Sequence, residues 1–252
     1  MLKCDALVLA GGRASDEMAA RTGTPVRALF PFKGKPFVAH TVDMLQQCEH
    51  VERIAVVGPS DLMQHLENAP DIFLTERQTI SENLFAGLDA LNPLNSVVIC
   101  PSDNPLLSSA AMDDFLSRIP TDADIAYPYL PYADFQKAFP DANNVGVKLK
   151  DGKWIGAGCV WVRAEKIPQL MKTIQNVLDS RKNLWKVVRL LGPMFLARFA
   201  LRLATSEEAA SRAEAIVGMR FRMVPDCSPQ FVIDVDDPED WDYLLSERWL
   251  SC

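Results

Sequence analysis

Glycines and carboxylates stand at the ends of three apolar segments of this 252-residue chain. They are Leu9-Ala10-Gly11-Gly12, Ser102-Asp103, and the pair Asp234 and Asp236. Glycine at a strand end lets the backbone pass close to a ligand and present N–H groups to a phosphate or a base. Carboxylates together with substrate phosphates are typical ligands of Mg²⁺. These residue types indicate a site for a phosphorylated ligand and its metal ion.

Each motif also has a simpler structural explanation. The glycine pair alone suits a tight turn, and Ser102 or Asp103 could shape the turn before a helix. Asp237 followed by Pro238 is a good helix start, with Asp237 as N-cap. Asp234 lies too early for capping, and on a strand it would share one face with Asp236. Its burial would need another reason, such as a metal ion.

The first half of the chain alternates short apolar runs with helical patterns. Strands are expected at residues 5–11, 53–58, 71–75 and 96–100, and helices at 36–48, 60–69, 80–92 and 108–119, with Ser60 as the N-cap of the second helix. Continuous apolar strands separated by helices predict a parallel sheet covered on both faces. The fold class is therefore α/β, a doubly wound, mostly parallel, three-layer structure. In such sheets, ligands bind beyond the carboxyl ends of the strands.

The pattern changes after about residue 124. We expect a strand running into a loop at 124–132, a β-hairpin at 144–163 with its turn at Asp151-Gly152, and a helical block at about 167–217. Strands at 220–224 and 231–236 and a helix at 238–250 close the chain. The sequence shows no linker, so we expect a single domain over residues 1–252 with a helical insertion at about 167–217.

Composition excludes several function classes. A net charge of −7 argues against a general nucleic-acid binder. The six cysteines form no C-x-x-C pair, and the three histidines show no zinc spacing, which together favour reduced thiols in a cytoplasmic protein. No signal-peptide layout and no transmembrane segment are expected, since no window holds the ~18 apolar residues of a span.

Taken together and in order, the motifs resemble the nucleotidyltransferase superfamily of the GT-A-like fold. The nearest resemblance is to the molybdenum-cofactor guanylyltransferase-like group of NTP transferases. The matching segments are "LVLAGG", "VRALFPFKGKPFVAHTVDML", "ERQTISENLFAGLDAL", "VVICPSDNPLLS" and "IDVDDPEDW". The sequence departs from the family in two places. Arg27 stands where the family has a signature lysine, and the glycine loop is longer and acidic.

The resemblance implies an enzyme that transfers an NMP group from an NTP to a small anionic, phosphate-type acceptor and releases pyrophosphate, with Mg²⁺ as cofactor. It implies catalytic roles for Arg27 and Asp103. It implies metal binding by Asp103, Asp234 and Asp236. The implied nucleotide-binding residues are Leu9, Ala10, Gly11, Gly12, Arg13, Arg27, Lys35, Ser81, Asn83 and Ser102. For Ser81 and Asn83 the alternative is a helix start capped by Thr79 and Glu82.

Two other functions stay open on the sequence. A GT-A glycosyltransferase would use a nucleotide-sugar, although Asp103 is followed by Asn104 rather than by the second acidic residue of a D-x-D motif. A nucleotide sensor without catalytic activity would suit the acidic loop and Arg27.

The helical block carries an apolar and basic segment at residues 184–204. Packing against the sheet is its simplest use. A lid over the acceptor end of the cleft would require Arg189, Arg198 or Arg202 to point into the cleft. A homodimer interface and peripheral contact with a membrane surface are further uses of the same amphipathic surface.

Overall fold

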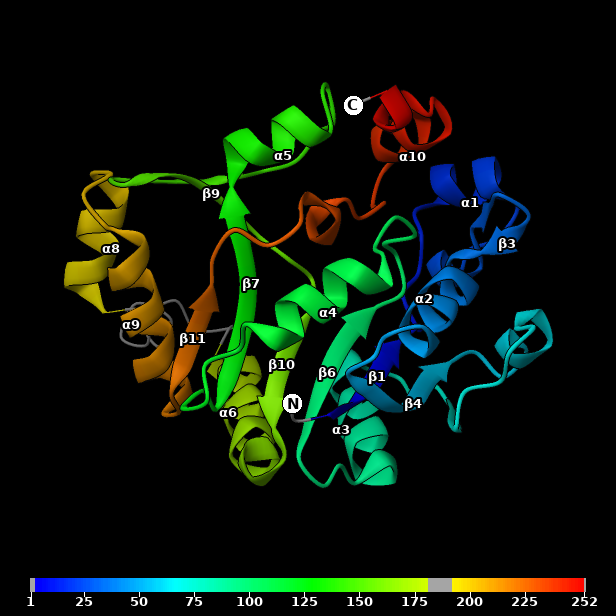
Figure 1. The fold of residues 1–252 in the computed structure, drawn as a ribbon, viewed down its shortest axis with the longest axis horizontal. Helices are drawn as coiled ribbons and strands as arrows, with labels where there is room; N and C mark the ends of the chain where they lie inside the picture. Colours follow the sequence, from blue (N-terminus) through cyan, green and yellow to red (C-terminus); the bar gives the residue numbers. More distant parts are fainter. Residues whose placement is uncertain (1–2, 181–191, 252) are drawn as a thin grey trace.

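The computed structural model describes residues 3–180 and 192–251. A nine-stranded sheet runs through the molecule in the order β5-β4-β1-β6-β10-β7-β9-β8, with β11 paired to β7. Helices cover both faces (Figure 1). One apolar cluster joins the sheet to α2 (Phe37–Gln46) and α4 (Ser109–Ser117), and a second joins it to α3 (Ile80–Leu91) and α6 (Ile167–Ser180). The predicted α/β three-layer fold is confirmed.

Four neighbouring strands form the parallel half of the sheet. They are β5 (Ile72–Thr75), β4 (Val51–Gly58), β1 (Cys4–Leu9) and β6 (Ser96–Pro101). The apolar runs of β4, β1 and β6 are buried because helices cover both faces, whereas those of the edge strand β5 are partly buried. Leu9 lies opposite Val57 on one side and Pro101 on the other, so the three strands end at one edge of the sheet.

The other half of the sheet is mixed. Strand β10 (Val160–Arg163) runs antiparallel to both β6 and β7 (Ile125–Pro131), and β11 (Phe221–Val224) runs parallel to β7. Strands β8 (Val147–Leu149) and β9 (Gly152–Gly156) form a hairpin, with β9 antiparallel to β7. The predicted hairpin turn at Asp151-Gly152 lies one residue earlier, at Lys150-Asp151, because Gly152 already pairs with Leu149 as the first residue of β9. The predicted hairpin over 144–163 ends at Gly156, and β10 is a separate central strand.

Three expected elements differ in the structure. The expected helix at 60–69 is only a 3₁₀ turn, Leu62–His65, because Leu62 alone is fully buried and little apolar surface is available to hold a longer helix. The expected loop after residue 131 begins with helix α5 (Tyr132–Ala138). Part of the acidic loop after β1 is helix α1 (Asp16–Thr22), whose N-cap is Ser15 and whose C-cap is the left-handed Gly23.

The expected strand at 231–236 is also absent. A 3₁₀ turn, Pro229–Val232, leads into irregular backbone. The Val235 N–H donates to the Asp103 carbonyl (3.1 Å), and the side chain of Asn144 donates to the Val232 carbonyl (2.6 Å). Loop groups therefore satisfy this backbone in place of a neighbouring strand.

Between β10 and β11, the described helices are α6, α8 (Pro193–Ala200) and α9 (Ser206–Val217). The capping box of Thr205 and Glu208 is confirmed at the start of α9. Residues 181–191, which hold part of the predicted 184–204 segment and Arg189, lie outside the described residues. In Figure 1, α8 lies at the opposite end of the sheet from β1 and α1.

The two ends of the chain pack together. Helix α10 (Pro238–Leu245) begins at the N-cap Asp237, as expected. Its Trp241 meets Phe30 edge-on, with ring centroids 5.7 Å apart. The same cluster holds the short hairpin of β2 (Pro31–Phe32) and β3 (Lys35–Pro36) against α10. The remaining short 3₁₀ turns are Arg27–Leu29, Ala164–Lys166 and Arg248–Ser251.

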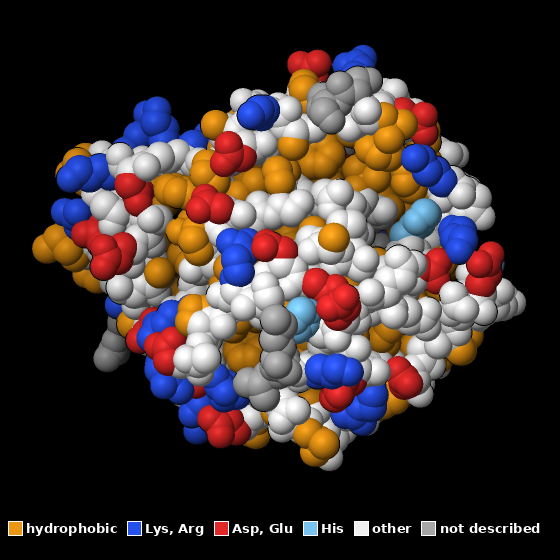
Figure 2. All heavy atoms as spheres, in the orientation of Figure 1, with side chains coloured by type: hydrophobic (Ala, Val, Ile, Leu, Met, Phe, Trp, Pro, Cys, Tyr) orange, Lys and Arg blue, Asp and Glu red, His pale blue; other side chains and the backbone are white. Residues whose placement is uncertain are grey.

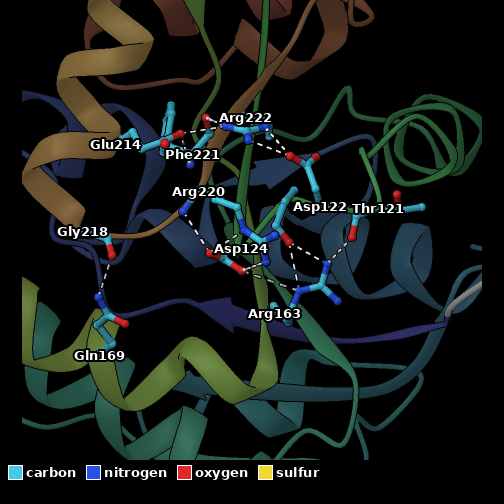
Figure 3. Close-up of polar contacts among 11 residues, drawn as sticks. Thr121, Asp122, Asp124, Arg163, Gln169, Glu214, Gly218, Arg220, Phe221 and Arg222 are labelled. Carbon is cyan, nitrogen blue, oxygen red and sulfur yellow. Dashed lines mark hydrogen bonds and ion pairs between the residues drawn. The ribbon is translucent and has the colours of Figure 1, made fainter.

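A network of arginines and carboxylates ties β7, β10 and β11 together (Figure 3). Buried Asp124 accepts from the Arg220 guanidinium (2.8 Å) and from the Arg220 backbone N–H (2.9 Å). Arg163, at the end of β10, donates to the Thr121 carbonyl (2.7 Å). The hydrogen bond from the Arg220 side chain is the main cause that lowers the pKa of Asp124 from 3.8 to about 2.

We expect Asp124→Asn to lower the free energy of unfolding at neutral pH by about 2 kcal/mol, because a buried charged acceptor is lost. The lowered pKa means that ionised Asp124 stabilises the fold above about pH 4, and that this contribution is lost as the pH falls toward 2. The stabilities of the wild type and the variant should therefore converge in that window. Urea unfolding at a series of pH values measures this. Asp122→Asn, which weakens the half-exposed ion pair with Arg222, is the matched control and should have a smaller effect.

Candidate functional site

The predicted glycines and Asp103 meet at the edge where β1 and β6 end. Ala10 is buried, and its N–H donates to the Val57 carbonyl (2.8 Å), which anchors the loop after β1. The Gly12 carbonyl accepts from the Arg27 N–H (3.1 Å). Asp103 comes two residues after the end of β6. The sheet therefore brings the glycine loop, Arg27 and Asp103 together.

Gly11 is closely packed and has no unusual backbone angle, so a larger residue would require the Glu76 side chain to move. A Cβ on Gly11 would lie 2.5 Å from a carboxylate oxygen of Glu76 and 3.1 Å from the amide nitrogen of Asn83. Arg13 holds Glu76 next to Gly11, because it forms an ion pair with Glu76 and donates a hydrogen bond to the Gly11 carbonyl (2.8 Å). A Cβ on Gly12 would meet Arg27 Cδ at 3.6 Å, an ordinary contact.

Arg27 stands between the glycine loop and the carboxylates. Its guanidinium pairs with Asp236 and lies 3.9 Å from an oxygen of Asp103. The side chain is 28% exposed, so one part of it reaches solvent. Its Nε is buried and has no hydrogen-bond partner among the described residues. Arg27 thus holds a cationic group with unused donor capacity at the centre of the site.

Three aspartates gather around this arginine. The hydrogen bond from Val235 to the Asp103 carbonyl holds Asp234 and Asp236, the two neighbours of Val235 in the sequence, close to Asp103. Burial, followed by repulsion from Asp234 and Asp236, raises the pKa of Asp103 to about 6. Desolvation in the cleft and repulsion from Asp236 also raise the pKa of Asp234, whose side chain still reaches solvent. The site therefore holds more negative charge than Arg27 neutralises.

Asp103 and Asp234 line a cavity of about 170 Å³ between the end of β6 and the loop before β10. The Asp103 Oδ1 atom is buried and has no hydrogen-bond partner within the described part of the chain. Among the described residues, no three His, Cys, Asp or Glu side chains are grouped so that they could hold a metal ion. Two carboxylates with an unpartnered oxygen suit a hard cation whose remaining ligands come from phosphates and water.

The other predicted nucleotide-binding residues lie in two places, at the edge of the sheet and in the first turn of α3. Leu9 ends β1, Ser102 is buried beside Asp103, and Asn83 contacts the glycine loop, so these residues belong to the same edge. Ser81 lies in the first turn of α3, where its hydroxyl is 3.2 Å from that of Thr79. The capping box of Thr79 and Glu82 is present as well.

Lys35 is not brought to the glycine loop. Its ammonium pairs with Asp43 (2.9 Å) and Glu67 (3.0 Å), and these contacts raise its pKa. Arg198 pairs with Glu208 (2.9 Å) and donates to the Leu203 carbonyl (2.9 Å), contacts that bind α8 to α9. Neither contact places Arg198 in the cleft, so the described residues give the lid hypothesis no support.

Sequence reasoning missed Glu76. This residue follows β5, whose last residue lies opposite Gly58 at the end of β4. Its N–H donates to the Gly58 carbonyl (2.8 Å), which brings its side chain to Gly11. A carboxylate just beyond a predicted strand was the available signal, since the same position relative to β6 located Asp103.

Comparison with known proteins identifies the family to which this sequence is similar. Residues 6–144 match the family model described as a MobA-like NTP transferase domain. A probable molybdenum cofactor guanylyltransferase from Pyrococcus horikoshii is 26% identical over 161 residues, which cover 61% of this chain and 79% of that protein.

Solved structures extend the likeness beyond the matched residues. A hypothetical transferase from Thermus thermophilus superposes with a TM-score of 0.83 at 26% identity, over 95% of this chain and 99% of that one. A 2-C-methyl-D-erythritol 4-phosphate cytidylyltransferase from the same organism shares the fold, with a TM-score of 0.56 at 15% identity over 98% of each chain. The likeness therefore includes the second half of the sheet and the closing helix.

The charge arrangement predicts opposite changes in the Asp103 pKa. Arg27→Gln should raise it above about 6, because a nearby positive charge is lost. Asp234→Asn should lower it, because a repelling carboxylate is removed. Carbon NMR of the Asp103 carboxyl group during a pH titration without metal or nucleotide measures both shifts. Arg21→Gln, which alters the ion pair with Asp242 far from Asp103 in the sequence, is the control. An Asp103 pKa that changes in neither site variant would contradict this arrangement.

Proposed function

The chain belongs to the family of MobA-like NTP transferase domains, and from this premise we propose that it transfers the NMP part of an NTP to a small anionic acceptor and releases pyrophosphate. The observation that carries the proposal is the placement of Asp103 and Asp234 around Arg27, next to the Gly11–Gly12 loop. This arrangement supports a phosphate-bearing ligand with its cation.

The nucleotide would lie along the loop after β1. Gly12 lies beside the side chain of Arg27, and a glycine backbone next to a cationic side chain suits phosphate oxygens. Arg13 would exchange its ion pair with Glu76 for the nucleotide, a change in which Glu76 becomes free to accept hydrogen bonds. Asn83 and Ser81 would stand on the side of the base and ribose.

Mg²⁺ would be held by Asp103 and Asp234. The buried, unpartnered oxygen of Asp103 and the mutual repulsion of the carboxylates support a cation at this place. When bound, Mg²⁺ would neutralise charge on the phosphate oxygens. Asp236 pairs with Arg27 in the structure, so its part in metal binding would require that ion pair to open.

The reaction needs positioning and charge neutralisation more than a reactive side chain. A phosphate oxygen of the acceptor would attack the α-phosphorus in line, and the bond to the β-phosphate would break as pyrophosphate leaves. Arg27 would stabilise the charge that develops on these oxygens. No Ser, Cys or His nucleophile is required.

A cytoplasmic location forms part of the proposal. The five described cysteines, Cys4, Cys48, Cys100, Cys159 and Cys227, are free and buried. Reduced thiols of this kind are typical of proteins in a reducing compartment.

Thermal stability against ATP, GTP, CTP and UTP with Mg²⁺ tests nucleotide binding. A nucleotide present at about 100 times its Kd should add about 2.7 kcal/mol of stability. Asp103→Asn should keep the fold, because the Asp103 backbone carbonyl still holds Val235, and should lose the Mg²⁺-dependent part of the shift. Asp89→Asn on the exposed face of α3 is the control. No shift with any of the four nucleotides would sink the proposal.

Pyrophosphate release tests the chemistry, once a nucleotide and a phosphate-bearing acceptor are paired. Arg27→Ala should lower kcat/KM by about 10²–10³, the scale for a lost electrostatic stabiliser. Arg27→Lys should recover part of that loss, since it restores the charge without the planar guanidinium. Full activity of Arg27→Ala would assign Arg27 to a structural ion pair with Asp236.

A further inference from the structure

Two buried thiols face each other on adjacent strands of the sheet. The antiparallel register places Val160, the first residue of β10, opposite Ile99 of β6. One step further along the same register, Cys159 lies opposite Cys100. Both cysteines belong to the apolar cluster that joins the sheet to α2 and α4, so their side chains point to the same face. Cys100 and Cys159 are therefore cross-strand neighbours.

The spacing of the two cysteines suits a disulfide bond. Residues directly opposite each other in an antiparallel pair have Cα atoms about 4.5–5.5 Å apart, inside the range of about 4.4–6.8 Å that disulfides span. The thiols are also within reach of each other. Interaction with the Cys159 thiol is the first cause that raises the pKa of Cys100, and burial is the second. A bond between the sulfur atoms would require side-chain rotation but no separation of the strands.

The same two thiols line the cavity that contains the Asp103 carboxylate. Asp103 follows Cys100 by three residues, and Gly158, which precedes Cys159, is part of the cavity wall. The wall is tightly packed, since a Cβ on Gly158 would lie 2.9 Å from the ring of Pro101. A movement that draws Cys159 toward Cys100 would therefore press this loop against Pro101, two residues before Asp103. A disulfide here would change the surroundings of the carboxylate.

Burial determines which oxidant can reach the pair. Cys100 is 1% exposed and Cys159 is 4% exposed, and burial makes thiols slow to react. Oxidised glutathione is large and anionic. In Figure 2, acidic and basic side chains are mixed over the coloured residues of the face that is shown, so these residues form no large basic area to attract it. A cavity of about 170 Å³ has room for a small neutral molecule such as hydrogen peroxide.

We propose that Cys100 and Cys159 form a reversible oxidation site for hydrogen peroxide, and that their disulfide alters the cavity of Asp103 and Asp234. The sulfur of Cys159, the more exposed of the two, attacks one peroxide oxygen. The O–O bond breaks, water leaves with the thiol proton, and a sulfenic acid remains on Cys159. The Cys100 sulfur then attacks the Cys159 sulfur, the S–O bond breaks, and a second water leaves with the Cys100 proton.

The balance of this reaction is complete with peroxide alone. Two electrons pass from the two thiols to the peroxide, which becomes two molecules of water, and a thiol reductant reverses the change. The site goes beyond the transferase activity proposed above and does not depend on it. In a reducing compartment the pair would be oxidised only while peroxide is present.

Mass spectrometry of the full-length protein after treatment with hydrogen peroxide tests the site. We expect a linked peptide pair that contains Cys100 and Cys159, with a mass loss of two hydrogen atoms that dithiothreitol reverses. Cys159→Ala and Cys100→Ala should each lose this product. Cys227→Ala is the matched control, because the Cys227 thiol is also buried but donates to the Val224 carbonyl (3.3 Å), and this variant should form the disulfide like the wild type. Thermal unfolding verifies that each variant is folded.

Carbon NMR of the Asp103 carboxyl group, without metal or nucleotide, tests the connection to the cavity. Its signal should move when the wild type is oxidised and should stay in place when Cys159→Ala is treated in the same way. Thiols that stay reduced would overturn the proposal, and so would sulfinic acid at Cys100 or Cys159 without the disulfide. A disulfide that leaves the Asp103 signal unchanged would overturn the connection to the cavity. None of these measurements uses transferase activity, so they distinguish this proposal from the proposed function.

Discussion

The cleft is organised by a charge imbalance, because three carboxylates surround a single guanidinium. Asp103, Asp234 and Asp236 repel one another, and Arg27 offsets only part of their charge. Such a cluster is unfavourable unless a further positive charge completes it. The fold maintains it through a backbone hydrogen bond from Val235 to the Asp103 carbonyl and through the packing of Val235 against Trp241 and its neighbours. Local stability at this edge is thus given up to keep the three carboxylates together.

The rest of the sheet separates this cleft from the additional helices. Strand β10 runs antiparallel between β6 and β7, and the Arg220–Asp124 network holds β11 beyond it. The helices α8 and α9 are attached on that far side, where their packing does not involve Gly11, Arg27 or Asp103.

The sequence predicted those parts of the fold that depend on local pattern. The buried strands, the N-cap of α10 and the position of Asp103 after β6 all follow from apolar runs and helix-start residues. Residues 231–236 look like a strand because they are apolar, but their backbone partners are Asp103 and the side chain of Asn144, far away in sequence. Glu76 and the carboxylate pairing of Arg27 depend on such distant contacts too, as does the ion pairing of Lys35. The periodicity of apolar residues carries no information about these long-range contacts.

The two parts of the cleft lie far apart in the sequence. Gly11 and Arg27 leave the ribosome well before Asp234 and the Val235 N–H that fixes it. During synthesis the nascent chain can form the parallel strands β1, β4 and β6 while the second carboxylate is still missing. A chain released prematurely, or one trimmed at its C-terminus before Asp234, would lack the aromatic contact of Trp241 with Phe30 and half of the acidic centre.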